Sequence, residues 1–178
     1  MMLSKLSTNE TPGEYSCSGI ELGSARIRIL VGHVAANQSL RTLHLSRCEI
    51  KDEDGIDIAR ILYTNTTLRK LELEGNILQI KTAKEFGKAL RVNKTLQFLD
   101  LESNSLTGDG EDFPGIQEML RALEENKSLL SLNLANNKLE PAIGKEIRKM
   151  LEKNHTLIDL ELGFNNFDLK DVSYTFCN

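Results

Sequence analysis

The segment Asn65-Thr-Thr-Leu-Arg-Lys-Leu-Glu-Leu-Glu-Gly-Asn-Ile-Leu78 carries the pattern that decides the fold. From Leu68 onward it reads L-x-x-L-x-L-x-x-N-x-L, and four further segments repeat this spacing. The first leucines of the other copies are Leu40, Leu96, Leu129 and Leu157. Consecutive copies lie 28 residues apart, except for one spacing of 33. Repetition in register predicts one supersecondary unit per copy, stacked on its neighbours.

Each copy predicts a short strand followed by a turn. In the tripeptide 71–73 two leucines flank a polar residue, as in a strand with one buried face, and stacked copies would pair such strands into a parallel sheet. The asparagine at position 76 and its equivalents can bond backbone groups that no regular ladder satisfies. Cys48 occupies this place in the first copy, so we predict a structural role for it.

Between the strands, apolar residues recur at three- and four-residue spacing, which predicts a helix in each copy. The recurring sets are Ile58, Ile61 and Leu62; Phe86, Ala89 and Leu90; Met119, Ala122 and Leu123; and Ile147, Met150 and Leu151. Leu30 and Val34 predict a further helix before the first strand, and the extra residues of the long spacing fall in 107–115. The pattern is the leucine-rich repeat consensus. It predicts an α/β solenoid of about five repeats, with short parallel strands on the concave side and helices on the convex side.

The composition fits this fold and excludes several classes of protein. Of 178 residues, 29 are leucine and 14 asparagine, while aromatic residues make up 5%. No apolar run of 18 residues and no signal-peptide pattern occurs, so we expect a cytoplasmic protein without a membrane span. A formal charge of −4 gives no general reason to expect nucleic acid or an anionic membrane as a partner. Cys17, Cys48 and Cys177 are widely separated and predict neither a disulfide framework nor a metal site.

The chain divides into three predicted parts. Residues 1–19 are expected to be a flexible leader or an irregular N-terminal cap, residues 20–168 the repeat domain, and residues 169–178 a C-terminal tail. Terminal repeats need capping, and neither end offers an obvious polar cap helix. The sequence is therefore compatible with a piece of a longer repeat protein.

Asn-x-Ser/Thr triplets occur at one repeated position, just past each predicted helix. They begin at Asn37, Asn65, Asn93, Asn126 and Asn154. In a secreted protein such triplets would indicate glycosylation. Their recurrence at helix ends favours a structural role instead, because asparagine tolerates the left-handed backbone conformation that often ends a helix.

Two segments carry a family resemblance: Ala122-Leu-Glu-Glu-Asn-Lys-Ser-Leu129 and Met150-Leu-Glu-Lys-Asn-His-Thr-Leu157. With the 28-residue period, they resemble ribonuclease-inhibitor-like leucine-rich repeats, as in tropomodulin and leiomodin, NOD-like receptors and the Ran GTPase-activating protein. The resemblance implies a curved solenoid that binds proteins. Two narrower functions are also implied: a small-GTPase regulator similar to the Ran activator, or an actin-cytoskeleton module similar to tropomodulin.

The outward strand positions are the candidate site, because they would line the concave face. We predict partner-binding roles for His44, Lys70, Glu72, Glu74, Phe98, Asp100, Glu102, Asn133, Asp159 and Glu161. This set holds six carboxylates against Lys70, with Arg47 just beyond it. Like charges on neighbouring strands repel, so a partner with a basic surface is expected to be attracted. Phe98 is the predicted anchor, since aromatic residues are enriched at interface centres.

Simpler interpretations of these residues are also open. An outward strand residue is often only solvated, and the Phe98 ring can simply lie on a neighbouring side chain. The acidic loops 52–54 and 109–112 lack the EF-hand spacing and precede helices, so we expect helix capping rather than calcium binding. His33, His44 and His155 fall on a helix, the concave face and a loop, without a nucleophile motif beside them. We therefore expect a non-catalytic protein without a cofactor.

Overall fold

The strands form one parallel sheet in the order of the sequence. The computed structural model describes residues 9, 13–108 and 113–166. Within them, six strands pair in the order β1 to β6. Their bounds are β1 Glu14–Ser16, β2 Thr42–His44, β3 Lys70–Glu72, β4 Phe98–Asp100, β5 Ser131–Asn133 and β6 Asp159–Glu161. Each strand is joined to the next by a helical crossover, as parallel pairing requires.

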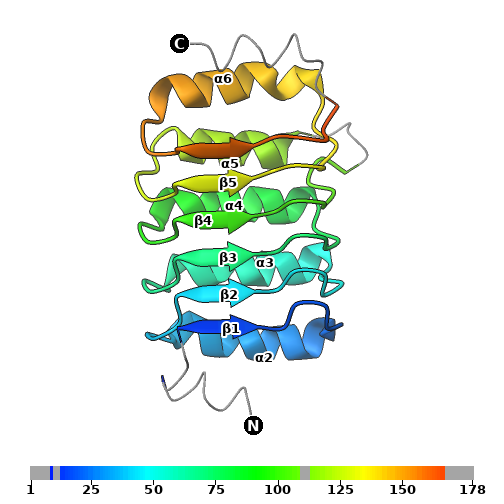
Figure 1. The fold of residues 1–178 in the computed structure, drawn as a ribbon, viewed down its shortest axis with the longest axis vertical. Coiled ribbons are helices and arrows are strands. Elements are labelled where there is room, and N and C mark those ends of the chain that lie inside the picture. Colours follow the sequence, from blue (N-terminus) through cyan, green and yellow to red (C-terminus); the bar gives the residue numbers. More distant parts are fainter. Residues whose placement is uncertain (1–8, 10–12, 109–112, 167–178) are drawn as a thin grey trace.

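The helices form a second layer on one face of this sheet (Figure 1). Their bounds are α2 Gly23–Ala36, α3 Asp52–Arg60, α4 Ile80–Val92, α5 Pro114–Leu123 and α6 Gly144–Lys153, with 3₁₀ turns η1 Ile61–Tyr63 and η2 Pro141–Ile143. The predicted α/β leucine-rich repeat solenoid is confirmed. The opposite face of the sheet, which we call the concave face, is left uncovered by helices.

Strand β1 adds to the five predicted strands. It lies inside the stretch 1–19 that we expected to be a leader or irregular cap, and it pairs with β2 in the register of Tyr15 with Leu43. Tyr15 and Cys17 stand 28 residues before two leucines of the first copy, and Cys17 is buried. The strand escaped the repeat pattern because neither residue is leucine. The predicted tail 169–178 lies outside the described residues.

Leucines stacked from repeat to repeat form the core. Leu43, Leu71 and Leu132 are completely inaccessible to solvent, and Phe86 is the largest fully buried side chain among the described residues. Burying a side chain of this size contributes about 1.5–3 kcal/mol. Gly87 permits close approach of α4 to α5, because a Cβ atom there would lie 2.7 Å from the backbone of the facing helix. The core is therefore continuous between these repeats.

The asparagines that follow the strands form the predicted buried ladder, and they link consecutive repeats. Asn76 Oδ1 accepts hydrogen bonds from the backbone N–H groups of Cys48 and Ile50, both at 3.0 Å. Its Nδ2 donates to the carbonyls of Leu45 and Leu73 at 2.8 and 2.9 Å. In the first copy Cys48 occupies the position of Asn76, and its Sγ lies 3.1 Å from the carbonyl oxygen of Cys17. The predicted structural role of Cys48 is therefore confirmed.

A second asparagine ladder runs along the helix ends. Asn65 Oδ1 accepts from the N–H of Leu68 at 2.7 Å, and its Nδ2 donates to the Val34 carbonyl of the preceding helix at 2.8 Å. Thr67, which completes the triplet, donates its hydroxyl to the Asn37 carbonyl at 3.1 Å. The Asn-x-Ser/Thr spacing is thus explained by capping between repeats, and the buried Asn65 amide is engaged on both sides.

The predicted left-handed backbone at these asparagines is wrong. Asn37, Asn93 and Asn154 have φ values of −72°, −69° and −85°, in the extended region. The side-chain amide, rather than a left-handed turn, satisfies the carbonyls at the helix ends. Extended backbone then leads the chain directly into the next strand.

Candidate functional site

The predicted site residues meet on the concave face in rows that follow the strand register. Lys70, Phe98, Ser131 and Asp159 form one row across β3 to β6, and Glu72, Asp100, Asn133 and Glu161 form the next. Between the rows lie the buried leucines, such as Leu99. The alternation predicted from the Leu-x-Leu pattern therefore places the side chains of the predicted site on one face of the sheet.

Over β1 to β3 the carboxylates of this face contact nitrogens of His44 and Lys70. His44 bridges two strands, with Nε2 2.8 Å from Glu14 Oε1 and Nδ1 in contact with Glu72 Oε2. Lys70 Nζ lies 2.6 Å from the other oxygen of Glu72. Burial alone raises the pKa of Glu72, but the hydrogen bonds from Lys70 and His44 outweigh burial and hold this pKa below its usual value. We call Glu14, His44, Lys70 and Glu72 the paired half.

The expectation of six carboxylates facing Lys70 alone needs correction. Glu72 is engaged by both Lys70 and His44, and Arg47 Nη2 lies 2.7 Å from Glu74 Oε1 on the adjoining loop. His44 lies beside Glu72 in the register of β2 and β3, and its second neighbour, Glu14, belongs to the unrecognised strand β1. Two of the six predicted acids are therefore neutralised within the chain.

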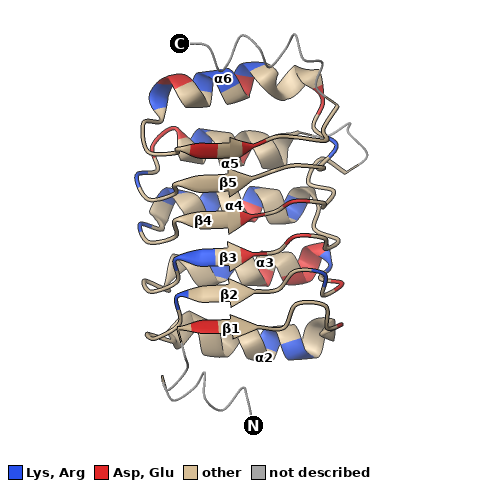
Figure 2. Ribbon diagram, viewed as in Figure 1, with Lys and Arg blue, Asp and Glu red and all other residues tan. Residues whose placement is uncertain are grey.

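Over β4 to β6 the negative charge is uncompensated. Figure 2 shows red segments on β4 and β6 and no blue segment on β4, β5 or β6. Within the described ranges, no Lys, Arg or His nitrogen pairs with the four carboxylates of this region. They are Asp100, Glu102, Asp159 and Glu161. We call these four carboxylates, together with Phe98, the anionic half.

Neutral donors hold the carboxylates of the anionic half in place. Glu102 Oε2 accepts from Asn133 Nδ2 at 2.9 Å, and Asp159 Oδ2 accepts from the Ser131 hydroxyl at 2.8 Å. Glu161 Oε1 accepts from the N–H of Gly163 at 2.8 Å. Such bonds orient the carboxylates without removing their charge.

Asp100 lies close to several other carboxylates. Its Oδ1 accepts a hydrogen bond from the Glu102 N–H at 3.0 Å, which favours the ionised form. Burial, followed by the negative charges of Glu102, Glu74 and Glu72, nevertheless raises the pKa of Asp100 above its usual value. The repulsion predicted from the sequence is thus present, but it is centred on β4.

Phe98 lies at the border of the two halves. Its side chain is 39% exposed, and register places it between Lys70 of β3 and Ser131 of β5. A hollow of about 340 Å³ opens here, lined by both strand rows from β3 to β6, including Phe98, Asp100 and Asp159. The geometry therefore leaves an aromatic surface beside carboxylates and accessible from solvent.

The acidic loop 52–54 caps a helix, as predicted, but a different one from the helix that it begins. Asp52 Oδ1 accepts from the backbone N–H groups of Gln79 and Thr82, both at 2.9 Å, at the N-terminus of α4. Asp54 accepts from the Ser24 hydroxyl at 2.8 Å. Within the described residues no group of His, Cys, Asp or Glu is arranged to hold a metal ion. The second acidic loop, 109–112, lies outside the described residues.

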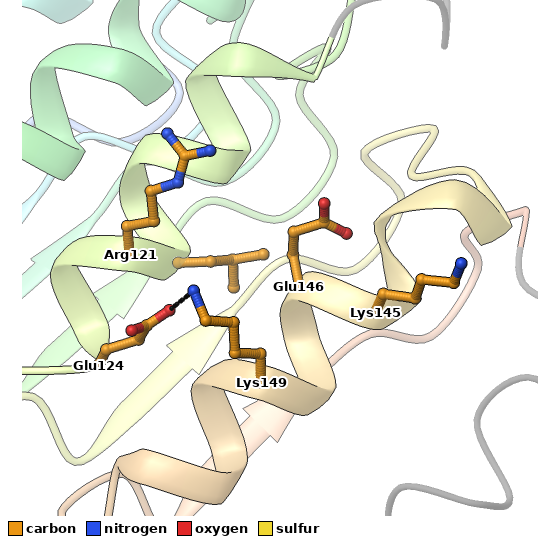
Figure 3. Close-up of a pocket in the computed structure, with 6 residues that line it drawn as sticks. Arg121, Glu124, Lys145, Glu146 and Lys149 are labelled. Carbon is orange, nitrogen blue, oxygen red and sulfur yellow. Dashed lines mark ion pairs between the residues drawn. The ribbon is translucent and has the colours of Figure 1, made fainter.

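The helical face carries a second hollow that the sequence did not indicate. It has a volume of about 170 Å³ and lies between α5 and α6. Figure 3 shows Arg121 and Glu124 on one side and Lys145, Glu146 and Lys149 on the other. Lys149 Nζ lies 3.2 Å from Glu124 Oε1, while the buried Glu146 Oε2 has no hydrogen-bond partner in the described structure. Charged side chains of both signs therefore line the hollow between these helices.

Comparisons with known proteins agree with the observed fold. A family model described as "Leucine Rich repeat" matches residues 36–59, 92–110 and 125–147. No curated protein matches the chain. Among solved structures, the tropomodulin C-terminal domain of Caenorhabditis elegans is similar, with a TM-score of 0.69 and 20% identity over 86% of this chain and 90% of that one. Leiomodin-1 actin-binding site 2 has a TM-score of 0.57 and 20% identity over 97% and 82%.

These structural likenesses concern the fold, since both identities are 20%. No helix in the described part of the chain combines the length and apolar character needed to cross a membrane.

Proposed function

The chain is a leucine-rich repeat protein, and from this premise we propose that it is a non-catalytic interaction module whose concave face binds a basic protein surface. The observation that carries the proposal is the anionic half, where four carboxylates have no cationic partner among the described residues. A binding partner that brings positive charge would lower the repulsion that these groups impose on one another. The same charges would speed association in a salt-dependent manner.

The proposal includes no catalytic step. His44 is the histidine of the concave face, and both of its ring nitrogens contact carboxylates of Glu14 and Glu72. Neither nitrogen contacts a hydroxyl or thiol that it could activate as a nucleophile.

The sheet face alone would make a small interface. Six strands of three residues each, about 4.8 Å apart, give roughly 300 Å². A standard interface covers about 800 Å² on each partner. We therefore include the loops that follow the strands, where Arg47 and Glu74 lie, in the proposed surface.

A reducing, cytoplasmic location is part of this proposal. Cys17 and Cys48 are both buried and unpaired. Secreted proteins commonly form disulfides, whereas cytoplasmic proteins keep their thiols reduced. Imaging of the full chain fused to a fluorescent protein tests the location.

The main test compares two variants with the same change of charge. In the first, Asp100→Asn, Asp159→Asn and Glu161→Gln neutralise the anionic half. In the control, Glu53→Gln, Asp57→Asn and Glu152→Gln neutralise exposed carboxylates of the helical layer. Proteins captured by the wild-type chain at low salt are identified and their affinities measured.

We expect basic partners that dissociate as salt rises, that are lost from the first variant and that are retained by the control. Equal retention by both variants, with affinity independent of salt, would contradict the proposal.

Actin is the second candidate partner, favoured by the likeness to leiomodin-1 actin-binding site 2 and to the tropomodulin C-terminal domain. Co-sedimentation with filamentous actin and binding to monomeric actin test it directly. Binding that the neutralised concave variant loses would unite the two candidates. Absence of binding to either form of actin at micromolar concentration would remove this candidate.

A further inference from the structure

We infer that the hollow beside Phe98 is a subsite for one arginine side chain of the partner. The inference rests on the proposed function and deepens it, because it assigns a residue type to a place on the concave face. The guanidinium group would lie on the Phe98 ring and donate hydrogen bonds to the carboxylates of Asp100 and Asp159.

The hollow provides an apolar wall as well as charge. Phe98 is 39% exposed although the strand leucine next to it, Leu99, is buried. In the registered row, Phe98 is followed by the small side chain of Ser131, which leaves room above β5. An aromatic ring attracts a cation that approaches its face, and the attraction strengthens when water is excluded.

Two carboxylates line the same hollow as this ring. Asp100 lies two residues further along β4, and Asp159 lies two strands away in the same row. Each has one oxygen engaged by a neutral donor, namely Oδ1 of Asp100 and Oδ2 of Asp159. In both groups the second oxygen can accept a hydrogen bond from a ligand, and the full charge remains to be neutralised.

Arginine fits this arrangement better than lysine. A guanidinium is planar, so it can stack on an aromatic ring while its N–H groups point outward in the plane toward carboxylates. A lysine ammonium is a compact, strongly hydrated charge that does not stack in this way. Groups of both shapes carry one positive charge, and therefore charge alone would not distinguish them.

Lys70 restricts the cation to one side of Phe98. It occupies the β3 neighbour of Phe98 in the register and is paired with Glu72. A second cation over β3 would meet Lys70 and His44, whereas over β5 and β6 it meets carboxylates without ion-pair partners and the neutral side chains of Ser131 and Asn133. The paired half thus defines the border of the subsite.

The experiment uses three capped tripeptides, Gly-Arg-Gly, Gly-Lys-Gly and Gly-citrulline-Gly, titrated into the isotopically labelled full chain and followed by NMR. We expect the arginine peptide to shift the backbone amides of Phe98, Asp100 and Ser131, with an affinity at least threefold above that of the lysine peptide. Citrulline has a similar shape without charge and should leave these amides unchanged.

Variants separate stacking from charge. Phe98→Leu should weaken the arginine peptide roughly three- to tenfold, which corresponds to a cation–aromatic attraction of intermediate strength, and should bring it to the level of lysine. Phe98→Tyr keeps the ring and should keep the preference, which guards against a loss caused by misfolding. Asp57→Asn, on the helical layer, is the matched charge control for Asp100→Asn.

Equal affinities for the arginine and lysine peptides, or a Phe98→Leu variant that keeps the arginine preference, would overturn the subsite. The proposed function would survive either result if captured partners still depend on the anionic half. Loss of both the peptide shifts and the salt-dependent capture would overturn the two together.

Discussion

Replacing Asn76 by alanine should destabilise the protein severely, because the side chain serves two repeats at once. Its Oδ1 holds the N–H groups of Cys48 and Ile50, and its Nδ2 holds two carbonyls, all in the buried ladder. A buried donor left without a partner costs about 1–3 kcal/mol. Two such donors, with partial relaxation, give an expected loss of about 3–5 kcal/mol in the free energy of unfolding. This is a large share of the roughly 5–15 kcal/mol typical of a whole domain.

Asn76→Cys is the informative second variant, since the first repeat already holds Cys48 in this place. The Cys48 thiol lies 3.1 Å from the Cys17 carbonyl oxygen, so a cysteine can replace the donor function of asparagine but accepts hydrogen bonds weakly. We expect it to recover about half of the alanine loss.

Urea unfolding at 25 °C, followed by circular dichroism, measures both variants against wild type. Gln38→Ala, at an exposed position on the loop before β2, is the control and should stay within about 0.5 kcal/mol of wild type. An alanine cost below about 1 kcal/mol, or a cysteine variant no better than alanine, would refute the reasoning.

Three further predictions concern packing, the helical layer and pH. Leu71→Ala should cost about 2–5 kcal/mol and the equivalent Leu160→Ala clearly less, because Leu71 is inaccessible whereas Leu160 is half-buried; equal losses in urea unfolding would be inconsistent with this. Glu85→Ala should cost about 1–2 kcal/mol, since Glu85 accepts bonds from Arg60, Tyr63 and Lys88, and Tyr63→Phe should cost less; thermal unfolding of both variants distinguishes the two. Folding lowers the pKa of Glu72, so ionised Glu72 stabilises the fold at pH values above its unfolded-state pKa, and this stabilisation is lost as the pH falls through its folded-state pKa. Folding raises the pKa of Asp100, so ionised Asp100 destabilises the fold at pH values above its folded-state pKa. Asp100→Asn should therefore raise the melting temperature at pH 7, and the difference from wild type should disappear at acidic pH. Glu72→Gln should lower the melting temperature at pH 7. A change of the opposite sign in either variant would contradict the charge assignment.

The repeat architecture could be predicted from the sequence because each leucine position recurs in several copies along the chain. The same redundancy identified the outward positions of β2 to β6, and the structure places Phe98 and Asp100 where the pattern required. Strand β1 escaped because Tyr15 and Cys17 replace its leucines. Periodicity identifies a position only when its residue keeps the consensus type.

Interactions between repeats were less accessible to prediction. The capping of α4 by Asp52 joins residues 27 and 30 positions apart, and the sequence beside Asp52 indicated its own helix instead. The pairing of His44 with Glu14 depends on β1, so the charge balance of the candidate site could not be counted correctly without that strand. The sequence around a residue indicates which helix that residue begins. The helix that its side chain caps is known only from the stacked structure.

The asparagine ladder at the helix ends also gives the stack a direction. Asn65, Asn93, Asn126 and Asn154 each reach back to a carbonyl of the preceding helix, and never forward. Removing the first repeat would therefore leave every later one of these helix ends closed, whereas removing a later repeat opens the end of the helix before it. Stepwise truncation from the two sides should accordingly be unequal in its effect, and opening measured by hydrogen exchange should advance from later repeats toward earlier ones.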